Sequence, residues 1–233
     1  MSQSQGISAP YGEQSTMSAF TPPRDWEAVY AAAENSYYFG EEPSQLAHTA
    51  LGFYRLFNGP VDGLALDLGS GEGRDTAYLA KAGLNVIARD VSPTGLEKTR
   101  TLLARLGVSG NRVDLGLMDV RDFDYSPETY DLALAANVYQ FLRPEESPGH
   151  IARLQVATKP GGICAIGVFS PAMIGWGAEI GDHFSATADE LLAYFPPSRG
   201  WLALDRTEYW TYRPENAMMV SFAYVVARKE LKV

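Results

Sequence analysis

Three glycines at alternate positions interrupt an otherwise apolar stretch of the chain. Gly69, Gly71 and Gly73 directly follow the strand-like run 65–68 and precede a run with helical spacing. Glycine reaches positive φ and has no Cβ, so the backbone can turn sharply here and lie against a ligand. A strand, a tight glycine turn and a helix form the opening of a nucleotide-binding α/β unit.

The residues beside the glycines indicate which ligand the turn suits. A dinucleotide fingerprint, G-x-G-x-x-G, would place its third glycine at position 74, which is Arg74. Glu72 and Asp75 at the start of the helix would repel a diphosphate, so a cofactor without phosphates fits better. With Asp67 in front, the run D-x-G-x-G-x-G resembles motif I of the class I S-adenosyl-L-methionine (SAM)-dependent methyltransferases. That resemblance implies SAM as the cofactor.

An acid ends the next expected strand, which covers residues 84–90. Asp90 lies roughly twenty residues after the glycines, where this type of sheet places a carboxylate on the ribose hydroxyls. Alternatively, Asp90 caps the following helix. Ser92, directly ahead of Pro93, already offers that cap, which favours the ribose role for Asp90.

A second acid, Asp119, lies near the end of the expected strand 113–120. The family resemblance implies that this carboxylate accepts a hydrogen bond from the adenine amine and that Val120 packs on the ring. Asp122 is the competing acid in the same loop. We interpret it as a solvated loop residue.

The apolar run 130–142 holds the fourth expected strand, whose carboxyl end opens at 137–139, where ligands bind in open α/β sheets. Asn137 lies at this end of the strand. The turn V-x-x-F-L that follows resembles a family pattern in which a nearby histidine acts as a base. Here Tyr139 and Gln140 occupy that place, so Tyr139 is a candidate catalytic residue. The absence of histidine from this turn favours an acceptor that depends little on a general base.

A glycine-rich loop at 170–185 follows the fifth expected strand, and we interpret it as part of the acceptor pocket. Met173 and Trp176 suit an apolar substrate wall. His183 is the histidine best placed to act as a base, although a polar residue at a helix entry is the alternative interpretation. His48 and His150 are scattered elsewhere, so no metal site is expected.

Residues 1–22 are rich in Ser, Gln, Gly and Pro, and we expect a flexible arm there. The following W-x-x-x-Y and Y-F-G-x-E-P-S runs resemble the N-terminal cap of small-molecule methyltransferases of the tellurite-resistance and thiopurine-methyltransferase-like groups. Trp26 and Tyr30 are interpreted mainly as packing residues. Tyr37 and Tyr38 are substrate-side candidates.

The expected fold is α/β: a doubly wound, mostly parallel seven-stranded sheet with helices on both faces and a C-terminal antiparallel hairpin, the Rossmann-like methyltransferase fold. The K-P-G-G run before an apolar strand and the two long strands 201–212 and 218–228 support it. The expected single domain, 23–233, comprises a helical cap (23–60), a SAM-binding core (61–169), the acceptor loop (170–185) and a C-terminal helix and hairpin (186–233). The residues expected to contact the cofactor are Asp67, Gly69, Ser70, Gly71, Arg74, Asp90, Val91, Asp119, Val120 and Asn137.

Composition restricts the class of protein. The 233 residues carry a net charge of −9 without a cluster of Lys and Arg, which argues against nucleic-acid or membrane-surface binding. No apolar run is long enough for a membrane span and no signal peptide is visible, so a cytoplasmic location is expected. Cys164 is the single cysteine, which excludes an internal disulfide and a thiolate-rich metal site.

The expected activity is transfer of a methyl group from SAM to a small molecule by in-line displacement, catalysed mainly by proximity and orientation. One alternative is a SAM-binding protein without methyl transfer. An NAD(P)-dependent oxidoreductase is the other, and Arg74 in the third-glycine position argues against it. The acceptor and the oligomeric state stay open.

Overall fold

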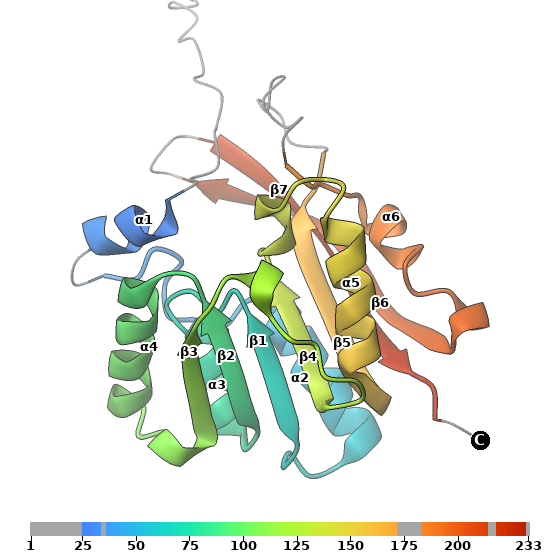
Figure 1. The fold of residues 1–233 in the computed structure, drawn as a ribbon, viewed down its shortest axis with the longest axis horizontal. Helices are drawn as coiled ribbons and strands as arrows, with labels where there is room; N and C mark the ends of the chain where they lie inside the picture. The colour runs from blue at the N-terminus through green and yellow to red at the C-terminus, as the bar shows by residue number, and fades with distance from the viewer. Residues whose placement is uncertain (1–24, 34–35, 172–182, 214–217, 232–233) are drawn as a thin grey trace, which may run out of the picture.

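The computed structural model describes residues 25–33, 36–171, 183–213 and 218–231. A seven-stranded sheet with the order β3-β2-β1-β4-β5-β7-β6 forms its centre (Figure 1). The strands are β1 (Leu64–Leu68), β2 (Asn85–Asp90), β3 (Val113–Leu117), β4 (Tyr130–Ala136), β5 (Thr158–Phe169), β6 (Trp201–Arg213) and β7 (Met218–Lys229). Strands β1 to β5 are parallel, and β7 pairs antiparallel with both β5 and β6. The expected fold class is therefore confirmed.

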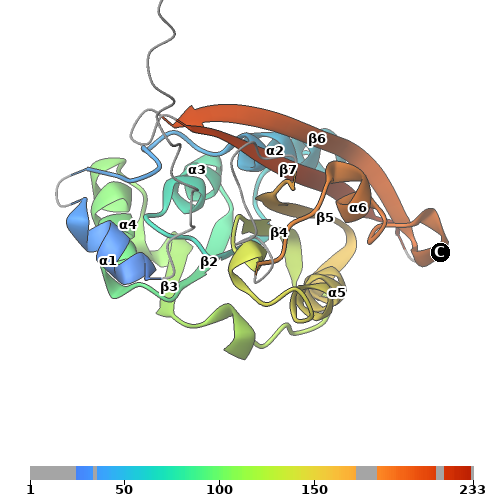
Figure 2. The same cartoon turned by 90° about the horizontal axis from the view of Figure 1, so that it is seen from above.

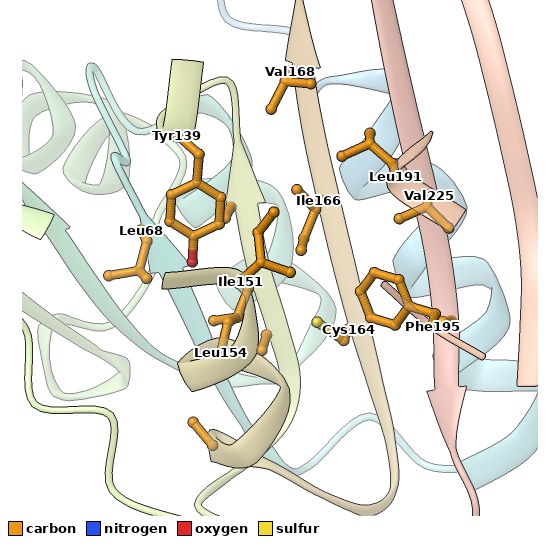
Figure 3. Close-up of a cluster of buried hydrophobic side chains, with 14 of the residues drawn as sticks. Leu68, Tyr139, Ile151, Leu154, Cys164, Ile166, Val168, Leu191, Phe195 and Val225 are labelled. Atoms are coloured by element: carbon orange, nitrogen blue, oxygen red, sulfur yellow. The ribbon is translucent and has the colours of Figure 1, made fainter. Parts of the chain in front are cut away.

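Helices cover both faces of the sheet (Figure 2). On one face lie α2 (Gln45–Asn58), α3 (Arg74–Ala82) and α4 (Pro93–Arg105); on the other lie α5 (Ser147–Ala157) and α6 (Ala188–Leu192). Side chains alternate along each strand, so β1 sends Leu66 and Leu68 toward α5 and Ala65 toward α2 and α3. This alternation builds one apolar core on each face, and Figure 3 shows part of the α5-side core.

The short helix α1 (Trp26–Ala32) lies at the carboxyl ends of the parallel strands, beside the start of α4 (Figures 1 and 2). The expected cap at 23–60 is thus divided. Helix α2 packs against β4 and β5 with Leu46, Ala50 and Leu51 buried, so it belongs to a layer of the sheet. Only α1 and the segment after it extend to the edge where the strands end.

Strand β3 ends earlier than the sequence pattern indicated, whereas β4 ends next to Asn137, where the sequence placed its open end. Strand β4 stops at Ala136 because Asn137 adopts φ +58, and the chain then forms the 3₁₀ helix η3 (Tyr139–Phe141). Strand β3 stops at Leu117, and Asp119 caps the 3₁₀ helix η2 (Val120–Asp122).

Among the described residues, further 3₁₀ helices are η1 (Gly110–Arg112) and η5 (Pro197–Arg199). Helix α6 begins with a reciprocal capping box between Thr187 and Glu190. The N-terminal arm 1–22 and the loop positions 172–182 lie outside the described residues. Within the described ranges, none of the helices combines the length and the apolar character that a membrane span requires.

Candidate functional site

A cavity of about 250 Å³ lies at the carboxyl ends of the parallel strands, where α1 approaches the sheet. All ten residues expected to contact the cofactor line it. They come from the turn after β1, the start of α3, the ends of β2 and β3 and the end of β4. Residues separated by up to seventy positions therefore meet at one place because parallel strands end at the same edge.

The glycine turn leaves no room for side chains on its inner surface. Gly69 has φ +69, and a Cβ there would lie 2.6 Å from the Cβ of Val138. Gly71 has φ +55, and a Cβ there would lie 2.7 Å from the hydroxyl oxygen of Tyr30. Between them, the buried hydroxyl of Ser70 has no hydrogen-bond partner among the described residues. The turn thus presents bare backbone and one unpaired hydroxyl to a ligand.

Asp90 is held rigidly at the end of β2. Its Oδ2 accepts the N–H of Gly71 at 2.8 Å, and its Oδ1 accepts the N–H of Ser92 at 2.9 Å. Burial raises the pKa of Asp90, although these backbone N–H groups act in the opposite direction. Each carboxylate oxygen keeps a free lone pair, so the group can still accept hydrogen bonds from a pair of hydroxyls.

Asp67 has a different electrostatic environment. It is buried at the end of β1, where its Oδ2 accepts the hydroxyl of Thr76 at 2.6 Å. Burial and the nearby carboxylate of Asp75 raise the pKa of Asp67 to about 7. The group can therefore change its charge near neutral pH.

The three arginines that line the cavity differ in their partners. Arg89 pairs with Asp114 at 2.7 Å, and Arg121 pairs with Asp119. Arg74 donates from Nη1 to the carbonyl oxygen of Phe39 at 3.1 Å and lies over the Phe39 ring. It forms no ion pair with the described part of the chain, so its charge is available to a carboxylate ligand.

Asp119 lies at the far end of the cavity and is already engaged. It accepts the Nε–H of Arg121 at 2.9 Å, and this partner lowers the pKa of Asp119. Val91, Met118 and Val120 line the same end with apolar surface. A flat ring fits between such side chains, with Asp119 at its edge.

Asn137 terminates β4 in the left-handed region, which a residue other than glycine adopts at a cost. Its N–H donates to the carbonyl oxygen of Gly167 at 2.8 Å, which holds the strained conformation. The turn places Val138 against Gly69 and brings Gln140 and Phe141 to the cavity.

Helix α1 covers the glycine turn and is anchored on α4. Tyr30 lies over Gly71, and Trp26 lines the cavity. Glu27 accepts hydrogen bonds from the hydroxyls of Ser92 and Thr94 and from the N–H of Thr94, and these donors lower its pKa. The sequence interpretation treated Trp26 and Tyr30 mainly as packing residues, whereas both also line the cavity.

Further aromatic residues also line the cavity, and none of them was among the site residues expected from the sequence. Phe39 follows α1, Phe141 lies in η3, Phe169 ends β5 and Phe222 lies on β7. The position of Phe169 at the carboxyl end of a parallel strand was a usable signal. Phe222 was not predictable, because only the antiparallel pairing of β7 with β5, which opposes Phe222 and Phe169, brings it to this edge.

The structure does not bring Tyr37 and Tyr38 to the cavity lining. The hydroxyl of Tyr37 donates to the carbonyl oxygen of Lys98 at 3.2 Å, so this side chain lies on α4. Tyr38 stands edge-on to Trp26 with ring centroids 6.0 Å apart, and its N–H donates to Glu72. The other two substrate-side candidates, Met173 and Trp176, fall outside the described residues.

Tyr139 points away from the cavity into the core on the α5 side. Figure 3 shows its ring among Leu68, Ile151 and Leu154. Its hydroxyl lies 3.5 Å from that of Tyr125, and burial raises the pKa of Tyr139 well above its usual value. A phenol in this position cannot reach a ligand without unpacking the core.

His183 lies behind the lining residues Gln140 and Phe141. It is buried, and its Nδ1 is 3.1 Å from the carbonyl oxygen of Gln140. A carbonyl oxygen only accepts, so Nδ1–H is the donor in this contact. No group of three His, Cys, Asp or Glu side chains within the described ranges is arranged to hold a metal ion.

Comparison with known proteins identifies the central part of the chain. Residues 65–162, from β1 into β5, match the family model described as "Methyltransferase domain". This match confirms the resemblance to the class I SAM-dependent methyltransferases, and it indicates S-adenosyl-L-methionine as the cofactor, as expected from the sequence.

Two curated relatives resemble the methyltransferase domain and its surroundings. One is Hemagglutinin 1 of Eikenella corrodens, 30% identical over 132 residues, which cover 56% of this chain and 42% of that protein. The other is a probable S-adenosyl-L-methionine-dependent methyltransferase, TehB, of Haemophilus influenzae, 27% identical over 173 residues, which cover 71% of this chain and 57% of that protein. The chain thus spans about half the length of these relatives.

Among solved structures, 1,6-didemethyltoxoflavin-N1-methyltransferase of Burkholderia thailandensis has the same fold. It superposes with a TM-score of 0.58 at 22% identity, covering 91% of this chain and 94% of that one. This likeness supports the fold of the methyltransferase domain and of the elements around it.

Proposed function

We propose that this chain is a SAM-dependent methyltransferase that acts on a small molecule. The observation that carries the proposal is the combination of the bare glycine turn, the carboxylate of Asp90 and the charge of Arg74 in the lining of one cavity. A ribose and an amino-acid carboxylate are the two groups that these residues recognise, and SAM contains both. The family match of residues 65–162 points the same way.

The residues that line the cavity include a suitable group for each end of the cofactor. Asp90 accepts the ribose hydroxyls, and Arg74 binds the carboxylate of the methionine part. Asp67, buried beneath the turn, attracts the α-ammonium group once it is ionised. The adenine ring lies between Val91 and Val120.

Further lining residues complete this set. Asp119 accepts the adenine amine while it keeps Arg121. The Ser70 hydroxyl and the backbone around Gly69, Gly71 and Asn137 border the rest of the cofactor.

SAM supplies a methyl group bonded to a sulfonium, which is a good leaving group. The protein's part is then alignment, which contributes on the order of 7–11 kcal/mol to such reactions. Trp26 and Phe141 exclude water from the space beside the turn. For an acceptor that loses a proton, a general base is worth about 10²–10⁴-fold in rate. His183, the candidate for this role from the sequence, lies behind Gln140 and Phe141 and does not line the cavity. Tyr139, Tyr37 and Tyr38 are left out of the proposed site because none of them lines the cavity.

Calorimetric titration with S-adenosylhomocysteine tests the proposal. We expect a Kd in the micromolar range, about −8 kcal/mol, and no binding of NADH. Arg74→Gln removes the charge that meets the carboxylate and should weaken binding about 10- to 100-fold. Arg100→Gln is the matched control, since Arg100 lies on the exposed side of α4 and pairs with Glu97.

A folded wild-type protein that does not bind S-adenosylhomocysteine would overturn the proposal. Equal loss of affinity in the Arg74 and Arg100 variants would remove the assigned role of Arg74.

A further inference from the structure

Glu72 is a buried acid in the glycine turn to which the proposed function gives no role. It lies between Gly71 and Gly73. Its Oε1 pairs with Nζ of Lys98 on α4 at 2.9 Å, and its Oε2 accepts the N–H of Tyr38 at 2.6 Å. Although Glu72 borders the cavity, both of its carboxylate oxygens therefore already have partners within the protein.

Glu72 and Arg74 hold the same two residues of the segment that precedes α2. Glu72 accepts the N–H of Tyr38, and Arg74 donates from Nη1 to the carbonyl oxygen of Phe39 at 3.1 Å. The guanidinium of Arg74 also lies over the Phe39 ring, 5.2 Å from its centroid. The dipeptide 38–39 thus links the buried acid to the arginine that lines the cavity. A shift of this dipeptide would move the carbonyl oxygen that holds Arg74.

Lys98 holds the same segment from the side of α4. Its Nζ donates to the carbonyl oxygen of Ser36 at 2.9 Å as well as to Glu72, and its own carbonyl oxygen accepts the hydroxyl of Tyr37 at 3.2 Å. Only 13% of the Lys98 side chain and 4% of the Glu72 side chain are exposed, so the pair is poorly screened. Breaking such a pair leaves an uncompensated buried charge, which is strongly unfavourable. The pair therefore restricts residues 36–39 to one position.

We propose that Glu72, together with Lys98, is a positioning residue that orients Arg74 toward the carboxylate of the cofactor. This inference rests on the proposed function, which assigns that carboxylate to Arg74. An arginine has five N–H donors in a planar fork, and the carbonyl oxygen of Phe39 accepts one of them. Fixing one donor restricts the guanidinium plane, so the other donors meet a carboxylate with a smaller loss of conformational freedom.

Two ligands that differ only by the carboxylate test the proposal. Calorimetric titrations use S-adenosylhomocysteine and 5′-(3-aminopropylthio)-5′-deoxyadenosine, which is the same compound without its carboxylate. In Glu72→Gln, we expect S-adenosylhomocysteine to bind about tenfold more weakly and the affinity for the analogue to change by less than about twofold. A merely structural role would weaken both ligands alike, and a Glu72 that only repelled the carboxylate would give tighter binding of S-adenosylhomocysteine in the variant. Either result would overturn the inference.

Two double variants complete the test. Glu72→Gln leaves Lys98 without its partner, so Glu72→Gln/Lys98→Gln, which removes both charges, is measured beside it. It should show the same selective loss, and binding of the analogue shows that the variants are folded. In Arg74→Gln/Glu72→Gln, S-adenosylhomocysteine should bind as in Arg74→Gln alone, because Glu72 acts through Arg74. Additive losses in this double variant would contradict a positioning role.

Asp131→Asn is the matched control. Asp131 also accepts from a lysine, Lys159, and from a backbone N–H, that of Leu64, both at 2.8 Å, but it lies near the start of β4 and does not line the cavity. Its affinities for both ligands should equal those of the wild type. If the folded wild type does not bind S-adenosylhomocysteine, the proposed function fails. If it binds and Glu72→Gln binds equally well, only the inference fails.

Discussion

Asp67 and Asp90 are two buried carboxyl groups in one cavity with different surroundings. Asp90 receives two backbone N–H groups, which counter the effect of burial on its pKa. Asp67 receives one hydroxyl and lies near the charge of Asp75, so its pKa rises to about 7. The two residues are therefore suited to different partners. Asp90 suits hydroxyls, and Asp67 suits a cation, whose positive charge favours the ionised form of the carboxyl group.

The raised pKa of Asp67 has a measurable consequence for stability. The folded state holds this proton more tightly than the unfolded chain, so the free energy of unfolding falls as pH rises from about 4 to 7. Asp67→Asn removes the effect and keeps an acceptor for Thr76. Its stability relative to the wild type should therefore increase by about 2 kcal/mol between pH 5 and pH 8, measured by urea unfolding. Parallel pH profiles for the two proteins would contradict the assignment; Asp122→Asn, on an exposed residue, is the control.

Gly71 depends on positive φ and on its close approach to Tyr30. Gly71→Ala should destabilise the protein by about 1 kcal/mol or more and weaken binding of S-adenosylhomocysteine. Tyr30→Phe removes the oxygen nearest to the added Cβ, so the double variant should recover part of the loss. Thermal unfolding of the two single variants and the double variant measures the loss of stability. Calorimetry on the same variants measures the loss of affinity for S-adenosylhomocysteine. Strictly additive effects would show that the contact with Tyr30 is not the cause.

At the scale of elements, the start of α4 is the point where the cofactor site and its cover meet. Ser92 caps α4 and donates its N–H to Asp90, while its hydroxyl donates to Glu27 of α1. One short segment therefore orients the ribose carboxylate and anchors the helix that carries Trp26 and Tyr30.

Removing this anchor should loosen α1 without unfolding the sheet. Glu27→Gln keeps the shape of the side chain but weakens its hydrogen bonds to Ser92 and Thr94. We expect faster amide hydrogen exchange confined to α1 and roughly tenfold weaker binding of S-adenosylhomocysteine. Glu97→Gln, on an exposed residue of α4, is the control. Unchanged exchange in α1 would show that Glu27 does not hold the helix.

The helices, the strands and the positions that the backbone fixes were predictable from the sequence. The directions of the side chains in the turns that follow the strands were not. The glycine turn, Asp90 and Asp119 follow from local spacing in a parallel sheet, and all three reach the cavity. Tyr139 lies in the expected turn, but the positive φ of Asn137 and the 3₁₀ geometry of η3 send its side chain into the core. The direction of the Tyr139 side chain depends on packing against α5, and no local sequence pattern encodes that packing.

At the scale of the whole molecule, the core around β5 is continuous and well shielded. Cys164 lies at the centre of this strand, fully buried, and burial raises the pKa of its thiol to about 12. Neighbours on β4 and β7 flank it on both sides. Exposing this thiol therefore requires the central strands to separate.

Labelling of Cys164 should accordingly report global unfolding. A thiol reagent should react negligibly with the native protein and fully in denaturant. S-adenosylhomocysteine at 100 times its Kd should stabilise the native state by about 2.7 kcal/mol and slow the labelling about 100-fold. Rapid labelling of the native protein would show that β5 opens locally.

The orientation of the cofactor in the cavity is the central claim, and a crystal structure with S-adenosylhomocysteine tests it most directly. We expect the ribose hydroxyls within hydrogen-bond distance of Asp90, the carboxylate on Arg74 and the sulfur directed toward Phe141. A ligand with its adenine ring against Phe141, or one that lies away from Asp90, would contradict it.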